Sequence, residues 1–273
     1  MAKLFRFYDP LKEGKGVKKN EPKKKPFFEF FEIYFGYFWK LLLAGLLSLP
    51  FSLLIIPIGL GQACLTYITR SATRRKHTFL VSDFFETIKK NWKQALPVGI
   101  INVLITALII FDFWFFFNQK QDLFAGIGMG IAIFAHVVFC SMKYYIWLLL
   151  ITFDFKVKRL YKNAFQLTFI NLWRNLLVEF ILLVIYALPL LLWFLKILPD
   201  QIMIIIYVLG AILFFTGFKS FLVNFIAFPC IKKIIIDPYY EANPDLDIQK
   251  RKDLGLIEQD IYDEDESIFV DKG

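Results

Sequence analysis

Long apolar runs recur along this chain, and they constrain its fold more than any other feature. Runs of about 17 to 28 apolar residues alternate with charged segments, and a bilayer core needs roughly 20 residues of helix to cross it. Of the 273 residues, 58% are hydrophobic and only 21% are charged, which is too apolar for a water-soluble fold of this length. An open sheet would leave backbone groups unpaired in lipid. The sequence therefore predicts an all-α integral membrane protein.

Prolines and polar turns divide the apolar runs into about six expected membrane-embedded helices. Pro50 and Pro57 interrupt the first run, because proline lacks a backbone donor and its preceding residue avoids the helical conformation. Paired as three hairpins, the expected helices cover about 33–49 and 58–77, 95–117 and 123–152, and 176–197 and 202–229. Five spans result instead if the first hairpin is re-entrant or forms a single span.

Basic segments follow the hairpins and predict their orientation. Lysine and arginine cluster between residues 70 and 93, between 156 and 174, and at 232–233. Because short basic loops remain in the cytoplasm, an even number of crossings is expected between successive basic segments. Both termini are therefore expected in the cytoplasm.

Two amphipathic helices, about 81–94 and 157–175, are expected at the cytoplasmic interface between the hairpins. The first has apolar residues at the spacing of a one-sided helix, with acidic residues in its first turn and basic residues in its last. In the second helix Phe165 and Trp173 are as far apart in the sequence as Phe84 and Trp92 are in the first. The two helices therefore resemble copies of one module. We take the following as candidate interfacial or docking residues: Asp83, Asn91, Trp92, Lys93, Trp173 and Arg174.

The two ends of the chain differ in charge from the membrane domain, expected at 31–235. Residues 1–30 form a basic tail, with nine Lys or Arg among the first 25 residues, and residues 236–273 form an acidic one. The basic tail is expected to be disordered or to lie on anionic headgroups of the bilayer. The acidic tail is expected to be solvated; docking on a basic partner, or pairing with the basic tail, are alternatives.

Three ionisable residues lie within the expected spans: Asp112, Lys143 and Lys219. Such groups are costly in lipid and usually face a protein interior or water. One interpretation places all three around a polar cavity. The other has them pair with carbonyls or a partner subunit, or extend to the interface, and the long lysine stem favours this second interpretation.

The motifs of common enzyme and cofactor sites are absent. The sequence contains no GxxxxGKS/T phosphate loop, HExxH zinc motif or GxSxG nucleophile elbow. The three cysteines are not spaced for a zinc site. No enzymatic activity, cofactor or metal is therefore expected, and the positive-inside bias explains the basic segments better than nucleic-acid binding does. Gly126 and Gly130 form a small-xxx-small pair suited to close helix packing.

Several motifs in the first half of the chain resemble the YesL family of small bacterial membrane proteins. The resemblance covers roughly residues 30–235 and is strongest over 48–117. It is carried by Ser48-Leu49-Pro50, Ile56 to Gly59, Tyr67 with Arg70, Ser82-Asp83-Phe84-Phe85, Lys90-Asn91-Trp92-Lys93-Gln94-Ala95 and Phe111-Asp112.

This resemblance implies a bacterial plasma membrane and a genetic neighbourhood of carbohydrate ABC importers. It supplies no catalytic residues. We therefore expect an accessory membrane subunit that packs on an importer permease and contacts the permease or its ATPase through charged cytoplasmic segments. The alternatives are a free-standing small-solute transporter or channel, and a membrane scaffold or assembly factor.

Overall fold

The computed structural model describes residues 25–76, 78–119, 122–196, 199–210 and 216–242. The tail segments 1–24 and 243–273, with the predictions made for them, lie outside these ranges. Regular structure in the described residues is helical: α1 (Pro26–Gly36), α2 (Phe38–Leu53), α3 (Ile58–Thr73), α4 (Leu80–Phe117), α5 (Leu123–Thr152), α6 (Val157–Ile170), α7 (Leu172–Phe194), α8 (Asp200–Leu209), α9 (Thr216–Ile231), the π-helix η2 (Lys232–Ile236) and α10 (Asp237–Ala242).

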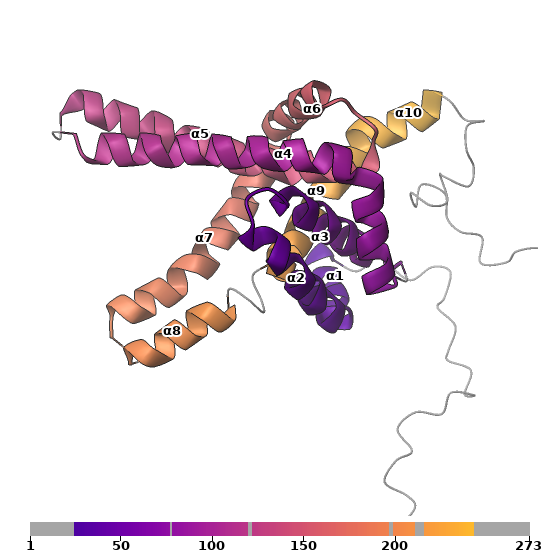
Figure 1. Ribbon diagram of the computed structural model, residues 1–273, viewed down its shortest axis with the longest axis horizontal. Coiled ribbons are helices and arrows are strands. Elements are labelled where there is room, and N and C mark those ends of the chain that lie inside the picture. The colour runs from indigo at the N-terminus through magenta and orange to yellow at the C-terminus, as the bar shows by residue number, and fades with distance from the viewer. Residues whose placement is uncertain (1–24, 77, 120–121, 197–198, 211–215, 243–273) are drawn as a thin grey trace, which may run out of the picture.

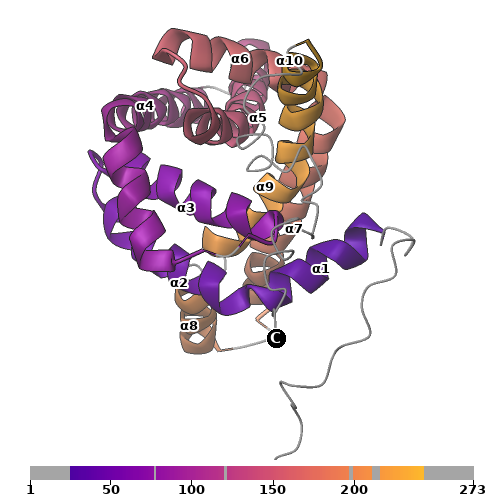
Figure 2. The same cartoon turned by 90° about the vertical axis from the view of Figure 1, so that its right-hand side faces the viewer.

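Two arms project from a helical body (Figure 1). One arm is the antiparallel hairpin of α4 and α5, and the other consists of α7 and α8. The body contains α1, α2, α3 and α9 together with the ends of α4, α5 and α7 that adjoin them. Viewed from the side opposite the arms, α1 and α2 lie at one edge, α6 and α10 lie at the other, and α3 and α9 run between them (Figure 2).

Helix α3 forms the centre of the body, because it packs against α2, α4, α5 and α9. Small residues permit these close approaches. A Cβ atom on Gly59 would lie 1.9 Å from the Ala95 carbonyl oxygen, and one on Gly99 would lie 2.7 Å from the Gly59 Cα atom. The crossing of α3 over α4 therefore requires glycine on both helices.

Helix α5 belongs both to the first arm and to the body. Asp122 caps its first turn, where the carboxylate accepts a hydrogen bond of 2.8 Å from the Ala125 backbone nitrogen. The half nearest this cap is largely exposed, whereas every residue from Tyr144 to Leu150 is buried in the body. Gly128 packs against the Phe116 ring of α4, but a Cβ atom added to Gly126 or Gly130 would meet nothing within 4 Å. The small-xxx-small pair thus makes no helix contact within the described part of this chain.

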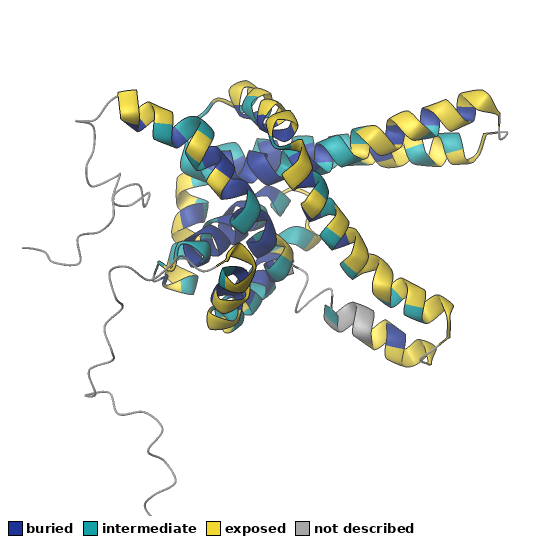
Figure 3. Cartoon of the chain, turned by 180° about the vertical axis from the view of Figure 1, so that it is seen from behind, coloured by how far each residue is buried: buried dark blue, intermediate teal, exposed yellow. Residues whose placement is uncertain are grey.

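The arms are apolar and exposed (Figure 3). Helices α4, α5 and α7 are each long and apolar enough to cross a membrane, and a fourth crossing results if α1 and α2 form one broken span. Large apolar side chains in such numbers do not remain exposed to water on a soluble protein. The chain is therefore an all-helical membrane protein, as the composition predicts, whereas the six-span hairpin arrangement is not confirmed among the described residues.

The expected first and last spans are each divided. The helix expected at about 33–49 is the end of α1 joined to α2 through Tyr37, with a bend of 69° between them. Helix α3 follows the turn at residues 54–57, as Pro57 predicts, and ends at Thr73. The span expected at 202–229 consists of α8 and α9, which are separated by a segment that includes residues 211–215, outside the described ranges.

The first amphipathic helix and the third span are one continuous helix, α4, of 38 residues. Figure 1 shows that α4 bends near its N-terminal end, and Pro97 lies inside it. Proline removes a helical hydrogen bond and bends a helix without ending it when neighbouring helices support the backbone. The helix expected at 81–94 and the span expected at 95–117 are therefore two parts of one bent helix.

The two expected amphipathic modules differ in structure. Phe84 and Trp92 lie in the uninterrupted α4, whereas Asn171 separates α6 from α7 and divides the second module between Phe165 and Trp173. Phe84 is fully buried, but Phe165 is exposed. The repeated spacing does not produce a repeated structure, and the helix expected at 157–175 ends at Ile170.

Candidate functional site

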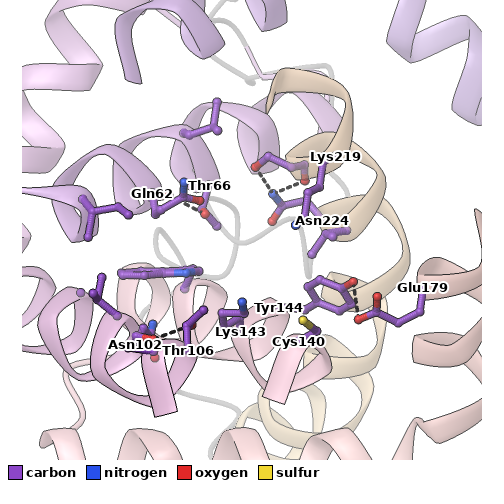
Figure 4. A pocket seen from close by; sticks show the side chains of 18 of the residues that line it. Gln62, Thr66, Asn102, Thr106, Cys140, Lys143, Tyr144, Glu179, Lys219 and Asn224 are labelled. Atoms are coloured by element: carbon purple, nitrogen blue, oxygen red, sulfur yellow. Dashed lines mark hydrogen bonds between the residues drawn. The ribbon is translucent and has the colours of Figure 1, made fainter. Parts of the chain in front are cut away.

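A cavity of about 670 Å³ lies where the arms meet the body, lined by α3, α4, α5, α7 and α9 (Figure 4). Its apolar walls include Leu65, Val103 and Val223. Its polar side chains are amides, hydroxyls and charged groups from all five helices: Gln62, Thr66, Asn102, Thr106, Cys140, Lys143, Tyr144, Glu179, Tyr186, Lys219, Ser220 and Asn224. The cavity is therefore an apolar space with polar groups placed at particular points, as in small-molecule sites.

Two of the three intramembrane ionisable residues line this cavity. Lys143 on α5 and Lys219 on α9 approach it from different helices. The Lys143 ammonium lies 5.2 Å from the centroid of the Phe139 ring. Within the described ranges, neither lysine forms a salt bridge with a carboxylate.

Glu179 supplies the one carboxylate among the described residues that line the cavity. Its Oε1 atom accepts a hydrogen bond of 2.7 Å from the Tyr144 hydroxyl, which joins α7 to α5. From the sequence alone, Glu179 is close enough to the end of its span to need no special role. The structure instead places it in the same cavity lining as the two lysines, so the charged side chains of the described lining sum to an excess of one positive charge.

Two asparagines of the cavity lining are almost completely buried, with 6% of Asn102 and 1% of Asn224 exposed. The Asn102 Oδ1 atom accepts a hydrogen bond of 2.7 Å from Tyr161, and its Nδ2 atom has no partner. The Asn224 Nδ2 atom donates to Thr69 Oγ1 at 2.6 Å, and its Oδ1 atom has no partner. Both atoms are completely buried between packed helices, so neither is exposed on the surface of the cavity.

Asp112 does not join the lysines. It is exposed on the arm formed by α4 and is not part of the cavity lining. The interpretation that groups all three ionisable residues around one cavity is therefore wrong for Asp112. Among the described residues, no group of three or more His, Cys, Asp or Glu is arranged to hold a metal ion.

The first set of candidate docking residues occupies the N-terminal part of α4. The Asp83 carboxylate accepts a hydrogen bond of 3.1 Å from the Phe79 backbone nitrogen at the start of the helix. The Asn91 amide donates to the Thr87 carbonyl. Trp92 and Lys93 are exposed, with the Lys93 ammonium 5.8 Å from the centroid of the indole. Asp83 and Asn91 thus stabilise the helix, and the other two remain accessible.

The second set lies at the start of α7. Trp173 is exposed over 83% of its surface. The Arg174 guanidinium donates to the Cys230 sulfur on α9 at 2.7 Å. Arg174 therefore joins two helices of the body, whereas Trp173 is available to lipid or to a partner.

A buried arginine stabilises the body outside the cavity. The Arg70 guanidinium donates to the Thr152 hydroxyl at the end of α5 and lies 5.7 Å from the centroid of the Phe228 ring on α9. Burial, followed by repulsion from Arg74, lowers the pKa of Arg70 to about 10. The residue stays charged near neutral pH and holds three helices together.

A family model matches residues 49–113. It is described as "Protein of unknown function, DUF624", a family to which the YesL proteins belong. The match covers less than half of the chain. It includes α3, most of α4 and the crossing of Gly59 over Gly99. No curated protein and no solved structure matches the chain.

Proposed function

We propose that this chain is an accessory membrane subunit that packs on a partner membrane protein. The observation that carries the proposal is the divergence of two apolar arms from one body. Their exposed side chains include Leu104 and Phe111 on α4, Phe134 on α5, and Phe180 and Leu191 on α7. A partner helix between or beside the arms would cover apolar surface that the body leaves open.

The open arrangement of the arms favours a partner over a complete pathway within this chain. A transporter surrounds its substrate path with protein, since irregular or polar surface at membrane depth must be enclosed. Here α7 packs on α5, α6, α8 and α9, while the distal parts of the arms lie apart. A second protein would close the space between them.

The identity of the partner follows from the resemblance to YesL proteins, supported by the DUF624 match. We propose the permease of a carbohydrate ABC importer in a bacterial plasma membrane. With both termini in the cytoplasm, the basic residues 1–25 and the acidic residues 237–273 would contact the permease or its ATPase. Anionic headgroups would hold the basic segments at the membrane surface.

Co-purification tests this proposal. The tagged full-length chain is extracted from its native membranes in a gentle detergent, and the recovered proteins are identified by mass spectrometry. An importer permease is expected in the eluate. Recovery of the chain without any permease would contradict the proposal.

A matched pair of glycine variants then tests the arm as the contact. Gly130→Leu on α5 and Gly36→Leu on α1 both add a side chain where the chain itself leaves open space. If the arm contacts the permease, Gly130→Leu reduces permease recovery several-fold and Gly36→Leu does not. Equal permease recovery with both variants would show that this face of α5 does not contact the permease.

The cavity favours a second function, a free-standing transporter or channel for small solutes. Lys143 and Lys219 would lie in its pathway. The purified chain, reconstituted alone into liposomes, would then show solute flux that disappears in Lys143→Ala or Lys219→Ala. Inert liposomes would argue against this function and leave the accessory role.

A further inference from the structure

We propose that the cavity between α3, α4, α5, α7 and α9 binds an anion of the phosphate-ester type. This site goes beyond the accessory role and does not depend on it, because the ligand contacts this chain alone. Two observations define the ligand: the charge of the cavity lining and the volume of the cavity.

The charge of the lining requires an anion. Lys143 and Lys219 face a space walled largely by apolar residues, and Glu179 balances one of them. Lys143 is half-buried and Lys219 is exposed. A positive charge at membrane depth without a counterion is costly, because an apolar environment solvates it poorly. A phosphate or carboxylate between the two ammonium groups supplies the missing negative charge and accepts charge-assisted hydrogen bonds from both.

The cavity volume of about 670 Å³ suits a small molecule. Two sources provide a phosphate ester of suitable size, the headgroup of phosphatidylglycerol and free glycerol 3-phosphate. Ile58, Leu65 and Val103 in the walls would also accommodate the start of a lipid chain. The two sources are separated by experiment.

The test is a binding measurement by native mass spectrometry on the full-length chain in a neutral detergent. Phosphatidylglycerol is compared with phosphatidylcholine, and glycerol 3-phosphate with glycerol. Preference for the anion in the lipid pair identifies a headgroup site, and preference in the soluble pair identifies a solute site. No preference in either pair overturns the proposal.

Charge variants locate the binding. Lys143→Gln and Lys219→Gln are each expected to weaken binding of the preferred anion at least tenfold, whereas Lys158→Gln, an exposed charge on α6, leaves it unchanged. Glu179→Gln removes the opposing charge and is expected to strengthen binding, a gain that damage to the fold would not produce. Wild-type affinity in the double variant Lys143→Gln/Lys219→Gln, or weaker binding in Glu179→Gln, would overturn the assignment.

Discussion

The body and the arms use the same apolar residues in opposite ways. In the body, short helices around α3 bury glycines, hydroxyls, asparagines and Arg70, so packing and paired polar groups stabilise it. In the arms, long helices leave leucine, isoleucine and phenylalanine exposed to the surrounding bilayer. An apolar side chain therefore stabilises the isolated chain only where protein, and not lipid, surrounds it.

The largest expected effect compares the two halves of α5. Leu149 is completely buried, and Leu149→Ala should cost about 2 to 5 kcal/mol of the free energy of unfolding, because it removes apolar contacts and leaves a void. Ile131 on the arm is 64% exposed, and Ile131→Ala should change stability by less than about 0.5 kcal/mol.

Unfolding in detergent can be followed with a thiol-reactive dye, since Cys64 and Cys230 are buried in the body. If Leu149→Ala and Ile131→Ala lower the free energy of unfolding equally, apolar side chains contribute to stability alike in the body and in the arm, which would contradict the comparison.

The second effect concerns close packing of glycines. A methyl group at Gly59 meets the backbone of α4, so Gly59→Ala should cost about 1 to 3 kcal/mol through overpacking. Gly130→Ala on the arm meets nothing and serves as the matched control. The thermal unfolding midpoint should fall for the first variant only; an unchanged midpoint in Gly59→Ala would refute the tight crossing of α3 over α4.

A smaller effect is expected from the buried polar contacts. The Tyr145 hydroxyl donates to Asn175 Oδ1 at 2.7 Å deep in the body. Tyr145→Phe leaves that oxygen unpaired and should cost about 1 to 2 kcal/mol. Tyr144→Phe should cost less, because the Glu179 carboxylate faces the cavity, where water can replace the lost donor. The reverse order in unfolding experiments would contradict this assignment of the two tyrosines.

The smallest effect is expected on the arm. Asp112 is exposed, so Asp112→Asn should change the stability of the purified chain by less than about 0.5 kcal/mol. If a partner covers the α4 face that carries Asp112, the same substitution should lower partner recovery from native membranes. A large loss of stability in the purified chain would instead show that Asp112 stabilises the fold itself.

The sequence predicts the helical membrane class and the break at Pro57 well, because both depend on local chemistry. It also singles out Lys143 and Lys219, since charge inside an apolar run is conspicuous. Asn102 carries no such signal: its importance depends on contact with Tyr161, which is distant in the sequence. Glu179 is not predicted as a site residue because it lies near the start of the span expected at 176–197. Helix α7 begins earlier, at Leu172, so Glu179 lies farther from the end of the helix than expected.

Composition alone does not show which way Asp112 faces on α4, but helical periodicity does. Asn102, Thr106 and Ile110 on α4 line the cavity at the spacing of one helical face. Each residue turns a helix by about 100°, so Asp112 lies about 200° around the axis from Ile110 and faces away. The division of α1 from α2 depends on neighbouring helices, which no local pattern reveals.

Photo-crosslinking in native membranes tests the account most directly. A benzophenone amino acid replaces Phe134 on α5 or Phe180 on α7, which are 63% and 64% exposed, and a third variant carries it at Phe221, which is buried in the body. The account predicts adducts with an importer permease from at least one arm position and none from Phe221. Adducts with lipid alone from both arm positions would contradict the proposal that the arms pack on a partner.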